Sequence, residues 1–224
     1  MPRLLLGAGA VGLGVAIVSL AIGTGGPQVI KIRGAGQVQE LLGGIQQDGS
    51  SLGPPEGSVT ISVFTDLQCS TCDAYEIQVV DPLIEEYART DRGRLEFHNY
   101  SLGQAETTKA AYAATAAGQQ DREWQFVELF FRNQDAAPGH TVTDEFLDDL
   151  GNTITDLDLD AWRRARESAA VRDRVEADGR LAADLGLRVN GPSIVVDGPA
   201  ATKVLQDGPS KQEVDAAVAA VGTP

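Results

Sequence analysis

The two cysteines of the chain, Cys69 and Cys72, stand three positions apart in the stretch FTDLQCSTCDAYE. Before them, apolar residues alternate with polar ones over residues 59–63, which predicts a half-buried strand. After them, apolar residues recur at helical spacing over residues 79–87. A strand, a Cys-x-x-Cys pair and then a helix form a specific arrangement, because the first cysteine then stands at the start of the helix.

The position of Cys69 predicts redox chemistry. Free N–H groups and the macrodipole at a helix N-terminus favour a thiolate, which is the nucleophilic form of cysteine. Cys72 follows on the same helical face, close enough to attack a mixed disulfide at Cys69. A purely structural disulfide closing about four residues would add roughly 2 kcal/mol, against about 4.7 kcal/mol for a loop of 100 residues. A metal site needs two more ligands, and His98 and His140 have no zinc-type spacing. We favour a redox pair over both alternatives.

The remaining pattern predicts the order of elements. Residues 94–100 form a second strand, and everything from 104 to 186 looks helical. Two strands joined by an Asp197–Gly198 turn follow, and then a final helix with the capping box Ser210–Glu213. Pro82 should kink the helix after the cysteines. This order predicts an α/β thioredoxin-like fold with a helical domain inserted in its middle.

The N-terminus carries an uncharged stretch, and Leu4–Ile22 is almost wholly apolar, which is long enough to cross a bilayer. Gly7, Gly9 and Gly12 match a dinucleotide-binding fingerprint, but no acidic residue follows at the required distance. We predict an uncleaved transmembrane anchor with the domain outside the cytoplasm; secretion after cleavage near Ser19–Ala21 is the alternative.

Composition and these patterns together predict how the chain divides into segments and domains. Residues 1–28 are the membrane anchor or signal sequence, and 29–56 are a Gly-, Gln- and Ser-rich linker with a short helical candidate. Residues 57–103 and 187–224 form the thioredoxin-like domain, and 104–186 form the inserted helical domain. The net charge of −14 argues against binding nucleic acid or an anionic lipid surface.

Several of these segments together resemble the DsbA-like family of thioredoxin-fold disulfide oxidoreductases. They are Phe64-x-Asp66-x-x-Cys69-x-x-Cys72, HNYSL, EWQFVELFFRNQ, TDEFL and LAADLGLRVNGPSIVVDG. The resemblance covers about residues 57 to 222. It implies that Pro192 stands where the family has a cis-proline beside the active-site cysteines, and that an extended client peptide would pair with the Gly191–Pro192 backbone there. The alternative is an ordinary turn proline, and the sequence alone does not fix the isomer. Gly191 replaces the Thr or Val usual in the family, and Ser101 stands where proline is frequent.

The resemblance also implies a function. The family passes disulfides to exported proteins and is commonly reoxidised by a quinone-linked membrane partner. Ser70–Thr71 replaces the Pro-His of enteric members, which removes a cation that stabilises the thiolate and implies a milder oxidant. We expect Cys69 to attack and Cys72 to resolve, in a monomer that needs no cofactor or metal.

Two other residues and two other functions stay open. Asp66 either tunes proton transfer at Cys72 or acts as a cap or turn carboxylate, and His98 is more often structural than catalytic. The alternative functions are a redox-idle thioredoxin-fold chaperone or binding module, and a reductase dedicated to a narrow set of clients.

Overall fold

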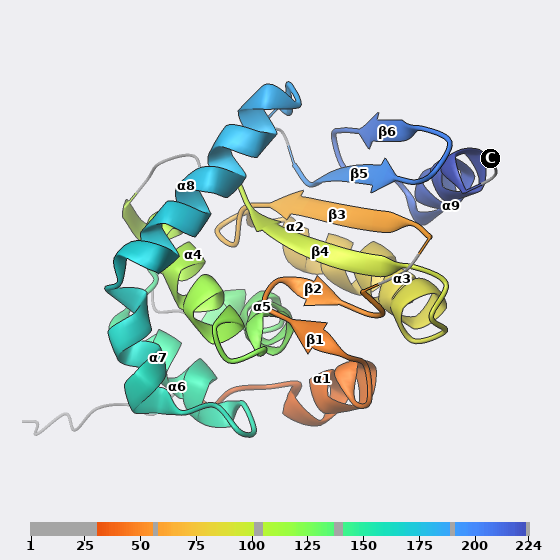
Figure 1. Cartoon of the computed structure of the whole chain (residues 1–224). Coiled ribbons are helices and arrows are strands. Elements are labelled where there is room, and N and C mark those ends of the chain that lie inside the picture. The colour runs from red at the N-terminus through yellow and green to blue at the C-terminus, as the bar shows by residue number, and fades with distance from the viewer. Residues whose placement is uncertain (1–30, 56–57, 101–104, 137–140, 189–190, 223–224) are drawn as a thin grey trace, which may run out of the picture.

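Six strands form one mixed sheet with the order β1-β2-β4-β3-β5-β6 (Figure 1). The structure is a computed structural model, and it describes residues 31–55, 58–100, 105–136, 141–188 and 191–222. The strands are β1 (Gln47–Asp48), β2 (Ser51–Leu52), β3 (Thr60–Thr65), β4 (Arg94–Asn99), β5 (Ser193–Asp197) and β6 (Thr202–Leu205). Only β3 and β4 are parallel; the other neighbouring strands are antiparallel.

The sheet centre follows from the apolar alternation in β3 and β4. Ile61 and Val63 are fully buried, as are Leu95 and Phe97 on the adjacent strand. Parallel neighbouring strands need a crossover connection, and the helical segment between β3 and β4 provides it. It comprises α2 (Cys72–Tyr75), η1 (Glu76–Val80), α3 (Asp81–Leu83) and η2 (Ile84–Ala88). The terminal helix α9 (Lys211–Val221) packs beside it and against β5 and β6.

Pro82 does not end this helical segment. The chain stays helical from Cys72 to Ala88, with π-helical turns η1 and η2 before and after the short α3 that contains Pro82. A proline has no N–H to donate to the preceding turn, and wider π-type hydrogen bonding accommodates this loss. The predicted disturbance at Pro82 therefore takes the form of a change in helix type.

A helical insert joins β4 to β5, and its helices gather at one end of the sheet (Figure 1). They are α4 (Ala105–Gly118), α5 (Glu123–Phe131), η3 (Gln134–Ala136), α6 (Asp144–Thr153), α7 (Leu159–Arg166) and α8 (Ala169–Asp184). Aromatic side chains fill the space between them: the Phe126 ring lies 5.8 Å from Trp162 and Phe130 lies 5.6 Å from Phe146. The thioredoxin-like α/β fold with a helical insert, predicted from the sequence, is present.

Residues 35–53 are not a linker, which corrects the prediction for residues 29–56. They form α1 (Ala35–Leu42), which packs against α5, and the hairpin β1–β2. Ser51 and Leu52 pair with Glu96 and Leu95 of β4, so the hairpin extends the sheet by two strands. Val38, Leu42 and Leu52 are buried in the main core. This segment belongs to the folded domain.

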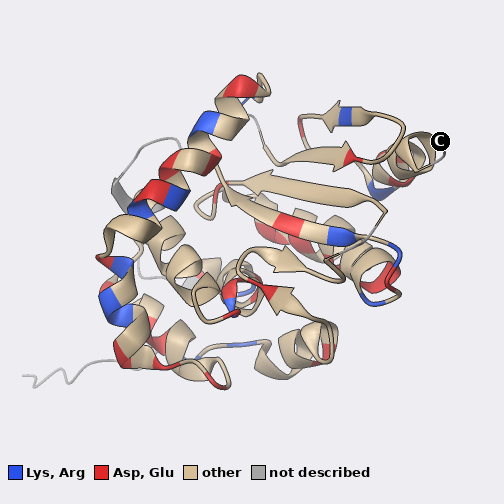
Figure 2. Cartoon of the chain, in the orientation of Figure 1, with Lys and Arg blue, Asp and Glu red and all other residues tan. Residues whose placement is uncertain are grey.

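The predicted anchor, Leu4–Ile22, lies outside the described residues. Within the part of the chain that the structure describes, no helix is long and apolar enough to cross a membrane. Figure 2 marks positions of both basic and acidic residues along the helices, and the acidic positions are spread over many elements. This distribution agrees with the scattered acidic residues seen in the sequence.

Candidate functional site

Cys69 and Cys72 form a disulfide directly after β3. Their Cα atoms lie 5.3 Å apart. Cys72 is the first residue of α2, whereas Cys69 lies in the preceding turn, so the helix begins three residues later than the sequence suggested. Cys69 is half-buried and Cys72 is only 1% exposed. A client thiolate therefore has access to the sulfur of Cys69 and much less to that of Cys72.

A chain of turns holds the loop between β3 and α2. The Cys69 N–H donates to the carbonyl of Asp66 (2.9 Å), and the Cys72 N–H donates to the carbonyl of Cys69 (3.1 Å). The Asp66 carboxylate accepts the N–H of Gln68 (2.7 Å). This is an Asx-turn, in which a side chain replaces a backbone acceptor. Of the two roles considered for Asp66, the geometry supports the turn carboxylate.

Ser70 and Thr71 are exposed and form the turn between the two cysteines. Thr71 is the N-cap residue of α2, but its side chain makes no capping hydrogen bond. Its Oγ1 instead lies 3.7 Å from the Sγ of Cys69. The hydroxyl of Thr71 thus lies close enough to donate a hydrogen bond to a thiolate formed at Cys69.

The segment Gly191–Pro192 precedes β5, next to the end of β3 from which the cysteine loop starts. Ser193 pairs with Phe64, so Pro192 falls opposite Thr65. No cis peptide bond occurs among the described residues, so the Gly191–Pro192 bond, whose isomer the sequence leaves open, is trans. Gly191 has φ +140°, a conformation that L side chains rarely adopt, and this explains a glycine where Thr or Val was expected.

The backbone of this segment is already engaged within the chain. The carbonyl of Pro192 accepts the N–H of Gly208 (2.9 Å). The next residue, Pro209, accepts a hydrogen bond from the Tyr75 hydroxyl (2.8 Å), which belongs to the helix of Cys72. The Gly191–Pro192 segment is thus tied to the active-site helix through residues 208 and 209. A client peptide that pairs with Pro192 would share a carbonyl that already accepts one hydrogen bond.

Sequence reasoning missed an acidic cluster beneath the cysteines. Glu76 lies one turn after Cys72 and is 1% exposed, and Glu128 of α5 is fully buried. Burial raises the pKa of Glu76 well above its usual value, and the neighbouring Glu128 adds to this. Burial also raises the pKa of Glu128 to about 8. Arg132 pairs with Glu128 and with Asp81 (2.6 Å). One signal was present in the sequence: Glu76 falls on the helical face that also carries Cys72.

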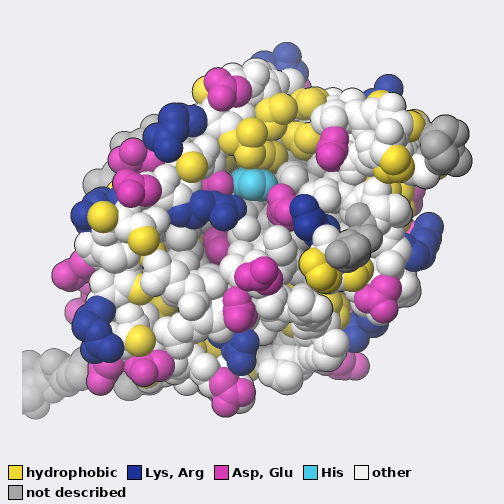
Figure 3. Space-filling view, in the orientation of Figure 1, with side chains coloured by type: hydrophobic (Ala, Val, Ile, Leu, Met, Phe, Trp, Pro, Cys, Tyr) yellow, Lys and Arg dark blue, Asp and Glu magenta, His cyan; other side chains and the backbone are white. Residues whose placement is uncertain are grey.

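His98 is a structural histidine. Its Nδ1 lies 2.9 Å from Asp178 of α8, and its ring stacks on Phe64 with centroids 4.4 Å apart. Burial lowers the pKa of His98, but Asp178 and Glu96 outweigh this effect and the net pKa is raised. Asp178 also accepts the N–H of Asn99 (3.1 Å), so it fastens α8 to β4. Figure 3 shows the small exposed part of the histidine in cyan, below a strip of hydrophobic side chains.

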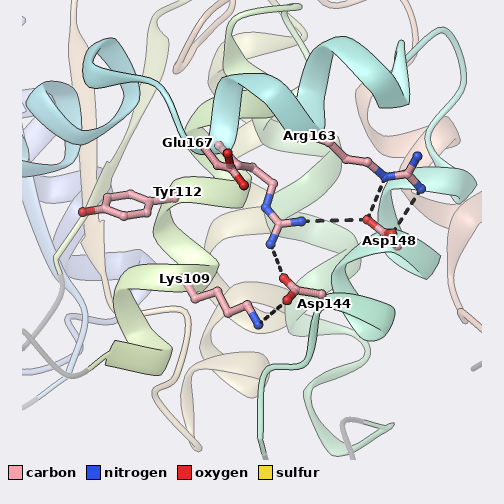
Figure 4. A pocket seen from close by; sticks show the side chains of 7 residues that line it. Lys109, Tyr112, Asp144, Asp148, Arg163 and Glu167 are labelled. Atoms are coloured by element: carbon pink, nitrogen blue, oxygen red, sulfur yellow. Dashed lines mark hydrogen bonds and ion pairs between the residues drawn. The ribbon is translucent and has the colours of Figure 1, made fainter.

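A hollow in the insert was the other candidate for a site. Figure 4 shows its charged side chains, which come from α4, α6 and α7 and point toward one another. Lys109 and Arg166 both pair with Asp144 (3.0 and 2.6 Å), and Arg163 pairs with Asp148 (3.1 Å). Because each of these cations already has a carboxylate partner, the cluster joins three helices rather than offering a binding site for an anion.

No cluster of His, Cys, Asp and Glu suited to a metal ion occurs in the described residues, and His140 lies outside them.

Comparison with known proteins identifies the family. A sequence profile described as thioredoxin matches residues 46–216. The chain belongs to the thioredoxin family. The predicted resemblance to its DsbA-like branch is confirmed, as is the enzyme class, thiol–disulfide oxidoreductase.

Three relatives document this similarity. The "Probable disulfide bond formation protein D" of Bacillus cereus is 25% identical over 151 residues, which cover 66% of this chain and 69% of the relative. BdbD from Bacillus subtilis, solved in its oxidised form, has a TM-score of 0.67 and 20% identity, covering 78% of this chain and 93% of BdbD. The α-DsbA1 of Wolbachia pipientis has a TM-score of 0.65 and 17% identity, covering 77% and 90% of the two chains.

Proposed function

We propose that this thiol–disulfide oxidoreductase acts outside the cytoplasm and forms disulfides in exported proteins, with Cys69 exchanging with clients and Cys72 resolving. The observation that carries the proposal is the unequal burial of the two cysteines in one disulfide: Cys69 is half-buried and Cys72 is 1% exposed. The names of the Bacillus relatives support the direction of exchange.

The exchange proceeds in two steps. A client thiolate attacks the Sγ of Cys69, the Cys69–Cys72 bond breaks, and Cys72 leaves as a thiolate that takes up a proton. A second client thiolate then attacks the client sulfur of the mixed disulfide and releases Cys69 as a thiolate. The client thus loses two electrons and becomes a disulfide, and the protein gains the same two electrons as the Cys69 thiolate and the Cys72 thiol. Of the two protons that the client thiols gave up, one is taken up by Cys72 and the other goes to solvent.

The start of the helical segment favours the release of Cys69. Its sulfur lies next to the N-terminal end of a helical run from Cys72 to Ala88, where N–H groups without helical partners stabilise negative charge. A lower thiol pKa makes a better leaving group, which drives the second step. We therefore expect the pKa of reduced Cys69 to lie below the usual value of about 8.5.

Location and reoxidation form part of the proposal. The apolar stretch Leu4–Ile22 supports a single N-terminal membrane helix, and the family resemblance supports a quinone-linked membrane partner that reoxidises the dithiol. An external protease added to intact cells should digest the chain beyond residue 30. Protection of the domain would contradict the location, and recovery of a protein that begins near Ile22 would indicate a cleaved signal.

Client trapping tests the function. The protein is mixed with a reduced, unfolded client that needs disulfides, and disulfide formation and mixed disulfides are followed. For trapping, the remaining thiol of each single-cysteine variant is first converted to its mixed disulfide with glutathione, which supplies the oxidising equivalent. A client thiolate then attacks the protein sulfur and releases reduced glutathione, so Cys72→Ser should accumulate mixed disulfides with the client, because the resolving thiol is gone, and Cys69→Ser should form almost none. A Cys69→Ser variant as active as the parent would overturn the proposal, and so would a reversed trapping pattern.

Two alternatives are separated by further measurements. A redox-idle chaperone would keep its client binding after both cysteines are alkylated in the reduced protein. A dedicated reductase would have an equilibrium with glutathione that favours the disulfide strongly, whereas an oxidase would favour the dithiol.

A further inference from the structure

Three consecutive side chains after α5 reach three different segments of the chain, one of which is the cysteine loop. Arg132 pairs with Asp81 of the active-site helix (2.6 Å). Asn133 accepts the N–H of Arg33 (2.8 Å) and donates to its carbonyl (3.0 Å). Gln134 donates through Nε2 to the carbonyls of Leu67 and Cys69. The segment Arg132–Gln134 thus links the helical insert to the active-site helix, to the start of the described chain and to the cysteine loop.

Gln134 makes the most direct connection to the reactive disulfide. Its side-chain amide has two N–H donors, and one nitrogen serves both carbonyls, with 3.2 Å to that of Cys69. The Cys69 carbonyl also accepts the N–H of Cys72 (3.1 Å), so it receives two hydrogen bonds. Neither bond involves a sulfur atom, and Gln134 acts on the site through the backbone of the loop.

The residue before Gln134 fixes its position. Asn133 is fully buried, and its Nδ2 donates to the carbonyl of Leu129 (2.7 Å) as well as to that of Arg33. Gln134 itself begins the short helix η3 and is half-buried. A side chain that starts from such a fixed backbone delivers its donors at a defined place, and little conformational entropy is lost in forming the bonds.

We propose that Gln134 is a positioning residue that makes the Cys69–Cys72 pair a stronger oxidant, by holding and partly neutralising the carbonyls of Leu67 and Cys69. Carbonyl oxygens carry negative partial charge, which disfavours a thiolate on the same loop. The amide hydrogens of Gln134 offset this charge. Their effect is larger in the reduced protein, where the sulfur of Cys69 is charged, than in the neutral disulfide. Stabilising the reduced form favours electron uptake.

The equilibrium with glutathione measures this effect without a client. In that reaction the protein disulfide and two reduced glutathiones give the protein dithiol and one oxidised glutathione, a two-electron exchange. The inference rests on the redox chemistry proposed above, but its readout is independent of client oxidation. Failure of client trapping would leave the glutathione result standing, and an unchanged equilibrium would leave the proposed function standing.

Three substitutions separate charge from packing. Gln134→Met keeps the length and removes the donors, so the equilibrium should shift toward the disulfide by about threefold to tenfold; tenfold corresponds to about 30 mV. Gln134→Glu replaces donors by a negative charge and should shift it further in the same direction. Gln134→Lys restores donors with a positive charge and should match or exceed the parent as an oxidant. The pKa of reduced Cys69 should rise as the variant becomes a weaker oxidant, so it should be lowest in Gln134→Lys and highest in Gln134→Glu.

Gln125→Met is the matched control, because it makes the same change on α5 at a residue that faces the cavity beside α1. It should leave the equilibrium at the parent value. Thermal unfolding of each oxidised variant checks that it is folded. The inference is supported if the oxidising strength in the glutathione equilibrium falls in the order Lys, Gln, Met and Glu at position 134. It is overturned if Gln134→Met and Gln134→Glu keep the parent equilibrium, if Gln134→Lys falls with them, or if Gln125→Met shifts as far.

Discussion

A buried glutamate gives this protein a pH-dependent stability that one substitution should remove. Glu123 opens α5, is 4% exposed, and has a pKa raised to about 8 by burial, against an ordinary 4.5. Asp178 raises this pKa further, and Arg174, His98 and the amide of Asn99 lower it only in part. At pH 7 the side chain is therefore mostly protonated in the fold but ionised in the unfolded chain.

The sign of the effect follows from proton linkage. A carboxyl whose pKa is raised by folding contributes its stability fully below the unfolded pKa of 4.5 and loses it as the pH rises through the folded value of about 8. With about 1.36 kcal/mol for each pKa unit, the loss is about 3 kcal/mol at pH 7 and about 5 kcal/mol above pH 9. Glu123→Gln does not titrate, and its amide can still accept from Asn99 (3.4 Å in the parent).

Denaturant unfolding of the parent and Glu123→Gln at several pH values from 4 to 9 measures this difference. The stability of the variant relative to the parent should increase with pH, by about 3 kcal/mol between pH 4 and pH 7. Glu145→Gln, the same substitution at an exposed position of α6, tests whether the change depends on burial. Parallel curves for the parent and Glu123→Gln between pH 5 and pH 8.5 would refute the reasoning.

Three further predictions concern single contacts. Asp178→Asn removes the charge that faces His98, Arg174 and the N–H of Asn99, so it should destabilise the fold by about 3 kcal/mol in denaturant unfolding and lower the pKa of His98 in an NMR titration. Gly191→Val places a branched side chain at φ +140° and should cost about 1–3 kcal/mol in the same assay, whereas Gly36→Ala, with open space within α1, should not. Ser210→Ala removes the side-chain half of the capping box of α9 and should lower the free energy of unfolding by about 1 kcal/mol, because the N–H of Glu213 loses the N-cap hydroxyl as an acceptor.

The parts of the fold that were predicted are those where local pattern and tertiary structure agree. β3 and β4 form where strands are predicted and bury their alternating apolar residues, and Ser210 caps α9 as expected. The hairpin β1–β2 was missed because each strand has two residues, which is too short for any alternation. Its strands exist because β2 pairs with β4, which lies more than 40 positions away in the chain.

The candidate site also contains residues that the sequence predicts and residues that only the structure shows. Cys69 and Cys72 were found because thiol chemistry needs a rare residue type at a spacing that is visible along the chain. Gln134 stands 65 positions from Cys69, and its type is common in helices and loops, so nothing local marks it. Its relevance comes from where the insert folds back onto the cysteine loop. The reactive atoms are therefore encoded locally, whereas the groups that set their energies are contributed by distant segments. If Gln134 does set the equilibrium of the disulfide, relatives with the same Cys-Ser-Thr-Cys sequence should differ as oxidants whenever the residue at the start of η3 differs.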